Sequence, residues 1–273
     1  MTDNTSTYNT NTNNTSTYNT NTNNTNYTNS TITGIANFTV LAETILQKRC
    51  NDLKKYDKFD IQQLFYTGLF VTILNTCPID IVNYILDNAI DLECTDQDNS
   101  KLIHYLVMYG DAENVKHLIN KKVDLESEDH LKRRPIHLAL KHSPYRIVKL
   151  LIDADVDLTT PDSDNWYPIH FALRYGKLKT AQYMIDKGID LETQTNDGWA
   201  PIHMAIRYGS SDIVQSLIDN NVDLESRDKD GWTPIHYAFI YSTSYIVKQL
   251  INKGVDLNKR TNDNFCILDH INK

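Results

Sequence analysis

Hydrophobic and polar positions return in the same order every 33 residues over most of the chain. Residues 196–229 read NDGWAPIHMAIRYGSSDIVQSLIDNNVDLESRDK, and the stretches one period before and after them repeat this order without an insertion. Each period holds two apolar patterns with helical spacing, separated by a polar break such as Gly209-Ser210. A fixed period of this length predicts a solenoid, in which each repeat buries its apolar face only against its neighbours.

Local signals inside the period predict a turn followed by two helices. Asp230-Gly231 marks a tight turn that needs a positive φ, and asparagine replaces the glycine at Asn165 and Asn264. A proline then fits the first position of a short helix, where its missing N–H costs nothing. These prolines are Pro135, Pro168, Pro201 and Pro234. Lys132 occupies the glycine position of its repeat, so we expect a distorted turn there.

The period also divides the chain into segments. Residues 1–31 are an Asn/Thr-rich tail with almost nothing to bury, which predicts disorder. Residues 32–62 are expected to form a helical N-terminal segment, with one amphipathic helix over about 38–56 and a second helix capped by Asp60. Residues 63–95 fit a degenerate capping repeat, because LFYTGLFVTIL is too apolar for an ordinary one. Five full repeats follow over 96–260, and 261–273 begin a partial C-terminal repeat.

Composition limits the kinds of partner that we expect the protein to bind and the cellular compartment in which we expect it. The formal net charge of −8 opposes a general affinity for nucleic acid or for an anionic membrane. The sequence has neither a run of about 18 apolar residues nor an apolar signal region at its start, so we expect no membrane span and no secretion. The scattered Cys50, Cys77, Cys94 and Cys266 form no CxxC and are interpreted as reduced thiols, which predicts a cytoplasmic protein.

The repeat resembles the ankyrin repeat, which also has 33 residues, a turn and a helix that starts with a TPLH-like motif. Here the motif reads RPIH, YPIH, APIH and TPIH at 134–137, 167–170, 200–203 and 233–236. The resemblance covers roughly residues 63–273 and implies an all-α repeat solenoid, a stack of β-turns each followed by two antiparallel helices. Its GVDLE and GIDLE stretches and its Asn/Ile/Lys/Tyr-rich composition are similar in style to the ankyrin arrays of amoeba-infecting giant viruses.

Two polar residue types keep the period and invite a chemical interpretation. The histidines are His104, His137, His170, His203 and His236. The aspartates are Asp91, Asp124, Asp157, Asp190, Asp223 and Asp256. Successive repeats lie roughly 8–10 Å apart, so such rows cannot converge on a metal ion or build a catalytic carboxylate pair. We expect the histidines to bond backbone between repeats and the aspartates to bond local turn N–H groups.

The positions that the fold does not fix carry the best candidates for binding. The resemblance implies that the turns and first helices line a concave face on which partners bind. The candidate partner-binding residues on that face are Trp166, Trp199, Trp232, Tyr175, Tyr208, Tyr241, Arg174 and Arg207. Tryptophan, tyrosine and arginine dominate interface hot spots. The alternative is that each tryptophan packs on the turn of the next repeat, with the tyrosine stacked beside it.

The leading hypothesis is therefore a non-catalytic protein–protein interaction module that binds an unidentified protein partner on the concave face. It predicts a monomer without cofactor or metal, and without nucleic-acid or membrane partners. The alternative is an adaptor or effector, in which the groove recruits a target and residues 32–62 engage host machinery such as a ubiquitin ligase. An enzyme is not expected, because the sequence shows no GxGxxG, P-loop or nucleophile elbow.

Overall fold

The computed structural model describes residues 38–46 and 50–271. The expected disordered tail at 1–31 lies outside the described residues, as do the first residues of the 32–62 segment and the last two of the chain. Within the described ranges there is no β-strand, and the extended pairing is limited to isolated bridges such as Thr95 with Lys101. The expected all-α repeat solenoid is confirmed.

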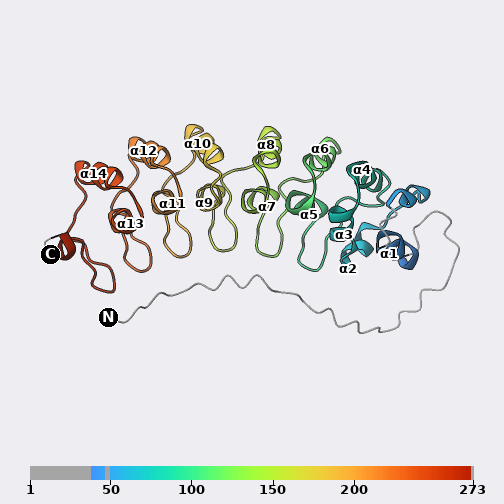
Figure 1. Cartoon of the computed structure of the whole chain (residues 1–273), viewed down its shortest axis with the longest axis horizontal. Coiled ribbons are helices and arrows are strands. Elements are labelled where there is room, and N and C mark those ends of the chain that lie inside the picture. Colours follow the sequence, from blue (N-terminus) through green and yellow to red (C-terminus); the bar gives the residue numbers. More distant parts are fainter. Residues whose placement is uncertain (1–37, 47–49, 272–273) are drawn as a thin grey trace. The chain divides into compact units, whose positions relative to one another are not determined.

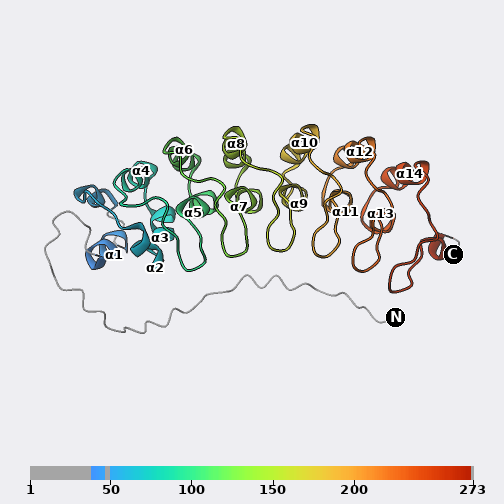
Figure 2. The ribbon, with the colours of Figure 1, turned by 180° about the vertical axis from the view of Figure 1, so that it is seen from behind.

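The helices of successive repeats stand in two rows (Figures 1 and 2). The first helices are α3 (Leu69–Thr76), α5 (Leu102–Tyr109), α7 (Pro135–His142), α9 (Pro168–Arg174), α11 (Pro201–Tyr208) and α13 (Pro234–Tyr241). The second helices are α4 (Ile79–Asp87), α6 (Ala112–Asn120), α8 (Tyr145–Asp153), α10 (Leu178–Asp186), α12 (Ser211–Asp219) and α14 (Ser244–Asn252). Each first helix packs against the first helix of the next repeat, which gives the stack its continuous core.

Small and apolar side chains explain how closely the first helices approach one another. Four of the six first helices, α7, α9, α11 and α13, each have one fully buried alanine; these are Ala139, Ala172, Ala205 and Ala238. The second helices bury one apolar stripe, as at Ile213, Val214 and Leu217 of α12, and leave the opposite face to solvent. The core is therefore a long seam between the two rows, shared by neighbouring repeats.

The turn of each repeat is closed by the side chain of its first residue. Asp228 Oδ1 accepts the N–H groups of Asp230 (3.0 Å) and Trp232 (2.8 Å), and Thr195 Oγ1 accepts the N–H of Trp199 (3.2 Å). Consecutive turns are then joined by one backbone hydrogen bond each. The donor and acceptor pairs are His130 with Asp98, Ser163 with Leu131, Asn196 with Asp164, Lys229 with Asp197 and Asn262 with Asp230, at 2.8–2.9 Å. The turns thus form a ladder along the stack.

The turn at Lys132 is regular, so the expectation of a distorted turn was wrong. Lys132 has a φ of 55°, next to 56° at the equivalent Asn99. Its N–H donates to Asp129 O (2.9 Å), as in the other turns. Asp129 Oδ1 accepts the N–H groups of Leu131 (2.9 Å) and Arg133 (2.8 Å), and these bonds hold the left-handed conformation that lysine alone disfavours.

We expect Lys132→Asn to raise the free energy of unfolding by about 0.5–1.5 kcal/mol. Asparagine tolerates the positive φ better, and at the equivalent positions Asn99 and Asn165 it donates to a carbonyl 29 residues further on, at Glu128 and Gln194. Urea unfolding followed by circular dichroism measures the gain.

Lys122→Asn is the control for that substitution. Lys122 also has a positive φ (59°), but it lies at the end of a second helix, outside the ladder of turns. This variant should gain only from the relief of backbone strain. Equal gains in the two variants would contradict the role of the side-chain bond to the next repeat.

The N-terminal segment differs from the expected single helix over 38–56. It forms α1 (Phe38–Leu46) and a separate 3-10 helix, η1 (Cys50–Lys55). α1 packs on α3 and η1 packs on α4, so this segment contacts both rows of the stack. Asp60 caps α2 (Ile61–Tyr66) as expected, since its carboxylate accepts the N–H of Gln63 (3.1 Å). At the other end the chain closes with α15 (Leu268–Ile271).

The expectation of four reduced thiols was wrong for two of them. Cys50 and Cys77 form a disulfide, with Cα atoms 5.6 Å apart, which links η1 to the end of α3. The two residues lie 27 positions apart, so the link depends on how the segment folds back on the stack and carries no local motif. Cys94 and Cys266 remain as thiols. A cytoplasmic location stays a prediction that no longer has cysteine usage behind it.

Candidate partner-binding surface

Three tryptophans stand at the same place in consecutive repeats, between the turn and the first helix. Trp166, Trp199 and Trp232 lie two residues before the first residues of α9, α11 and α13, and all three are half-buried. The indole of Trp199 lies 4.8 Å from the ring of Tyr237, and that of Trp232 stacks on Phe265 at 5.8 Å, centroid to centroid. These two tryptophans therefore contact an aromatic ring of the following repeat.

Two arginines connect the first helices through their guanidinium groups. Arg174, the last residue of α9, lies 4.1 Å from the centroid of Tyr208, which ends α11. Arg207 lies 5.4 Å from Trp199, 5.2 Å from Tyr208 and 4.7 Å from Tyr241, which ends α13. Each guanidinium thus contacts the tyrosine one repeat ahead, and such cation–π contacts fix its position at a modest energy.

Five of the eight predicted residues contact one another directly, and the other three, Trp166, Trp232 and Tyr175, contact rings outside the predicted set. Trp199 also stacks on Tyr208 at 6.3 Å, which joins the tryptophan row to the row of helix ends. Tyr175 is 39% exposed and Tyr241 is 50% exposed, while Tyr208 is half-buried between its neighbours. We call this surface the aromatic–arginine strip, and its members are Trp166, Trp199, Trp232, Tyr175, Tyr208, Tyr241, Arg174 and Arg207. It runs along α9, α11 and α13 (Figure 1).

Rings from the first helices support the strip from below, and the sequence analysis missed them. Phe171 is buried 5.4 Å from Trp166 and stacks on Tyr175 at 6.2 Å. Tyr237 is buried between Trp199 and Trp232 and stacks on Tyr241 at 6.2 Å. The signal was present, because both rings follow the periodic histidine by one residue. That position also holds Tyr105, Leu138 and Met204, so an aromatic ring is not periodic there.

The tyrosine under the last tryptophans is itself fixed by a polar bond. The hydroxyl of Tyr237 donates to Asp228 Oδ2, the same carboxylate that closes the turn before α13. Burial and this nearby carboxylate raise the pKa of Tyr237 far above its ordinary value, so the hydroxyl stays a donor. The turn, the buried ring and the tryptophan above it therefore form one rigid unit.

The periodic histidines bond backbone as expected, but mainly within their own repeat; His104 Nε2 also lies 3.2 Å from Arg133 O of the next repeat. Their rings are buried, and in each the Nδ1 atom accepts the N–H that precedes the first helix, as His203 does from Ala200 at 3.0 Å. In four of them Nε2 lies at hydrogen-bond distance from a carbonyl 23 residues further on, as His203 does from Ser226 O at 3.2 Å. Burial lowers the pKa of His137, His170 and His203 to about 4, so these rings are neutral near pH 7.

The periodic aspartates also serve the backbone. Each accepts the N–H two residues ahead through Oδ1, as Asp223 does from Glu225 at 2.8 Å. The glutamate in turn accepts the N–H of the next repeat's aspartate, as Glu192 Oε1 does from Asp223 at 2.8 Å. No group of three or more His, Cys, Asp or Glu side chains within the described ranges has the geometry to hold a metal ion. These rows therefore explain the cohesion of the stack and not a reaction.

Comparison with protein-family models identifies the repeat. The family described as "Ankyrin repeats (3 copies)" matches residues 69–162, 145–228 and 169–261. The chain belongs to the ankyrin-repeat family. No curated protein matches it. Ankyrin repeats are generally protein–protein interaction modules and are typically non-enzymatic. No helix among the described residues of this ankyrin-repeat protein is both long and apolar enough to cross a membrane.

The adaptor hypothesis for residues 32–62 stays a prediction. In the described part of that segment, α1 contacts α3, and η1 contacts α4 and is tied to α3 by the Cys50–Cys77 disulfide. Leu41, Ile45 and Leu53 are buried in these contacts. The segment therefore covers the end of the ankyrin stack, which is the role that an apolar repeat end requires.

Proposed function

We propose that this ankyrin-repeat protein binds a partner protein through the aromatic–arginine strip. The observation that supports this most directly is the state of the two arginines. Neither Arg174 nor Arg207 forms an ion pair with a carboxylate among the described residues, although both guanidinium groups are held in place on aromatic rings. Their N–H donors are thus positioned in advance and available to a partner, which lowers the entropy lost on binding.

The exposed parts of the strip support the proposal further. Tyr175, Arg174 and Tyr241 are exposed at the ends of α9 and α13, next to half-buried tryptophans. A surface with rigid rings at its base and polar tips at its rim has the composition of an interface hot spot. Packing explains the buried faces of the tryptophans, but it does not require Arg174 and Tyr175 at the end of α9, or Tyr241 at the end of α13, to be exposed.

The charge around the strip defines the complementary chemistry. A partner that presents a carboxylate or a carbonyl beside an apolar side chain would pair with Arg174 and Arg207. The turn tips carry aspartates, and the side chains of Asp98 and Asp197 are 69% and 72% exposed. We therefore expect basic residues on the partner opposite the turns, where they would speed association more than they tighten binding.

Removing the exposed end of the strip should weaken binding strongly. We expect the triple variant Arg174→Ala, Arg207→Ala and Tyr241→Ala to lose about 2 kcal/mol or more of binding free energy, which is about a 30-fold rise in Kd. Partners would be captured from lysate with the unaltered chain and identified by mass spectrometry, and their affinities measured by calorimetry with purified partner. Trp199 is left intact, because its ring is part of the packing and its loss would also change stability.

A second triple variant provides the matched control. Tyr145, Tyr183 and Tyr245 are exposed on the second helices α8, α10 and α14, at 44%, 37% and 50%. Their replacement by alanine removes a similar exposed area from the other row, and it should leave the partner affinity unchanged. Circular dichroism must show both variants folded. A partner that binds the strip variant and the unaltered chain equally would refute the proposal.

A further inference from the structure

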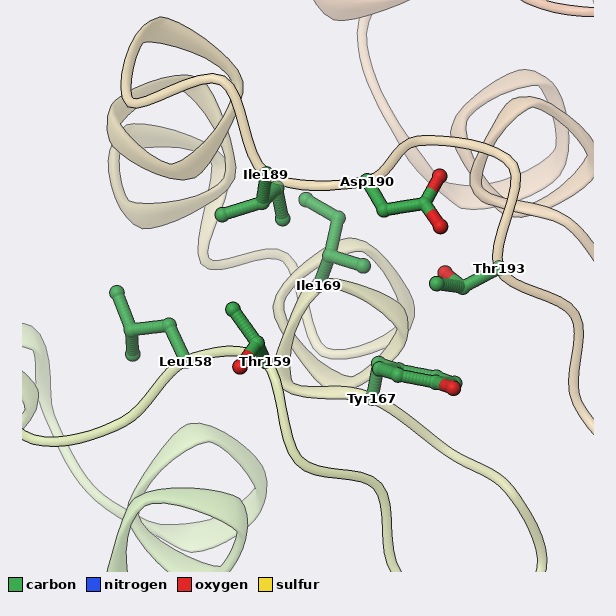
Figure 3. A pocket seen from close by; sticks show the side chains of 7 residues that line it. All are labelled: Leu158, Thr159, Tyr167, Ile169, Ile189, Asp190 and Thr193. Atoms are coloured by element: carbon green, nitrogen blue, oxygen red, sulfur yellow. The ribbon is translucent and has the colours of Figure 1, made fainter.

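A cavity of about 250 Å³ lies between the repeat of α8 and the repeat of α9 and α10. Figure 3 shows the Asp190 carboxylate and the hydroxyl groups of Thr193 and Tyr167 on one side of it. Leu158 and Ile189 lie on the other side, with the Ile169 side chain between. None of these residues belongs to the aromatic–arginine strip, so the cavity is a separate feature of the stack.

We call the contact between two consecutive repeats a joint. In the two preceding joints, a basic side chain occupies the place of this cavity. At the first, Lys101 Nζ lies 2.8 Å from Glu93 Oε2 and 3.1 Å from Asp124 Oδ2. At the next joint, 33 residues on, Arg134 Nη1 lies 2.7 Å from Glu126 Oε2 and 2.8 Å from Asp157 Oδ2. In both joints a largely buried basic side chain bridges two carboxylates, one from each repeat.

At the cavity the same three positions hold Thr159, Tyr167 and Asp190. Compared with the preceding joint, tyrosine stands in place of the basic residue and threonine in place of the glutamate, while the aspartate is the same. Asp190 Oδ1 accepts the N–H of Glu192 at 2.9 Å, but the carboxylate has no ion pair with any cation among the described residues. The cavity, which is open to solvent at the exposed Thr159 and Asp190, therefore keeps one of the two carboxylates of the preceding joint and has tyrosine in place of the basic residue.

The next joint along the chain indicates that the absence of a basic residue is not by itself what opens the cavity. Its three positions hold Glu192, Ala200 and Asp223, so it also lacks a basic residue. Glu192 nevertheless accepts the N–H of Asp223 at 2.8 Å and so joins the two repeats. Thr159 is too short to do this for Asp190, and its Oγ1 donates instead to Asp157 at 2.7 Å. The missing glutamate thus opens the cavity.

The hydroxyl group of Thr193, beside the cavity, lacks the hydrogen bond that its equivalents have. Thr193 Oγ1 is buried without a hydrogen bond, whereas the equivalent Ser127 and Ser226 donate to the carbonyl oxygens of Asp124 (3.1 Å) and Asp223 (3.0 Å). This side of the cavity is thus less completely bonded than the same place in the neighbouring repeats.

We propose that this cavity binds an arginine side chain of another polypeptide. The guanidinium would pair with Asp190, as the guanidinium of Arg134 pairs with Asp157 in the preceding joint. The ring of Tyr167 provides an aromatic surface for a flat cation, and Ile169 and Leu158 provide apolar surface for the methylene stem. The arginine of the partner would thus take the place of the basic side chain that the chain itself supplies in the two preceding joints.

The test uses the whole chain and a minimal probe, N-acetyl-arginine-N′-methylamide, with the citrulline analogue as its neutral isostere and the lysine analogue as a second cation. Titrations are followed by two-dimensional amide NMR to tens of millimolar. We expect shifts confined to residues near Thr159, Tyr167 and Asp190, with binding of the citrulline analogue at least about tenfold weaker. Tighter binding of the lysine analogue than of the arginine probe would reject arginine as the occupant, and absence of shifts at these residues would overturn the proposal.

Variants then separate the cavity from general charge attraction. Asp190→Asn keeps an oxygen for the Glu192 N–H and should weaken the arginine probe at least about tenfold, whereas Asp223→Asn in the next joint should not. The double variant Thr159→Glu and Tyr167→Arg rebuilds the bridge of the preceding joint, so it should raise the melting temperature and abolish binding of the probe. Equal affinity in Asp190→Asn and Asp223→Asn, or probe binding to the folded double variant, would refute the site. Neither result would affect the aromatic–arginine strip.

Discussion

The free energy of unfolding is expected to fall steeply as the pH decreases from 6.5 to 4. Burial lowers the pKa of His137, His170 and His203 from the ordinary 6.5 to about 4 in the folded protein. Between these values the unfolded chain binds protons that the folded chain excludes, so stability is fully present above pH 6.5 and is lost on acidification. Each such histidine contributes a slope of up to about 1.4 kcal/mol per pH unit in this window.

Urea unfolding at a series of pH values from 7.5 to 4.5, followed by circular dichroism, measures this slope. Burial also lowers the pKa of His104 and His236, which adds to the effect. Carboxylates act in the same direction but at lower pH. Against the opposing effect of burial, hydrogen bonds from Thr160 and Thr159 and the charge of Arg134 lower the pKa of Asp157 from 3.8 to about 2. The histidine contribution is therefore the one that appears first as the solution is acidified.

Two variants test whether the pH dependence of the unfolding free energy comes from the buried histidines. His203→Gln should reduce the slope by the share of one histidine, whatever it does to the stability at pH 7. Leu217→Ala, a buried change in α12 that lowers stability without removing a titratable group, should leave it unchanged. A stability that stays level down to pH 5 in the unaltered chain would contradict the interpretation of the buried histidines as neutral rings bonded to backbone.

The second large effect is expected at a single glycine in the ladder of turns. Gly198 has a φ of 79°, and a Cβ added there would meet the Cα of Asp228, in the next turn, at 2.8 Å. That close approach results from the backbone bond between Lys229 and Asp197. Gly198→Ala combines backbone strain with a clash against main chain, so the two turns must separate. We expect a loss of about 3 kcal/mol in the free energy of unfolding.

Gly254→Ala isolates the strain from the clash. Gly254 has nearly the same φ, 81°, but an added Cβ would meet nothing within 4 Å. Its replacement should cost only about 1 kcal/mol. Thermal and urea unfolding of both variants provide the comparison. Losses of equal size would show that the turns are not held in close contact by the bond between Lys229 and Asp197.

The repeat architecture could be predicted because many short-range signals agree. A turn residue, a proline and a histidine recur at fixed spacing, so an error at one repeat is corrected by the others. Lys132 shows the limit of this local reasoning: its propensity argues against the turn, but the Asp129 side chain holds the conformation. The Cys50–Cys77 disulfide shows another limit, because it depends on the packing of η1 beside the end of α3, which no local motif encodes.

The candidate surface was predicted in part. The period places tryptophan, tyrosine and arginine along one side of the first helices, and the structure brings them into contact there. The sequence alone could not show that Arg207 lies on the ring of Tyr241, or that the tryptophans are half-buried, because both depend on the spacing between repeats. The cavity at Asp190 is visible in the sequence only as a break in a pattern, Glu to Thr at 159. That the break leaves a space follows from the packing of the joint.

The bonds between turns have a consequence for how such a chain changes over generations. Each turn donates one backbone N–H to the turn before it and accepts one from the turn after it, always at the same relative position. Excising or duplicating 33 residues therefore leaves every remaining donor facing an acceptor of the same kind, and the two new ends join without any compensating substitution. The array can be lengthened or shortened in whole units, and each duplication extends the strip by one set of side chains. Recombination between repeats thus supplies new recognition surfaces while the fold is preserved.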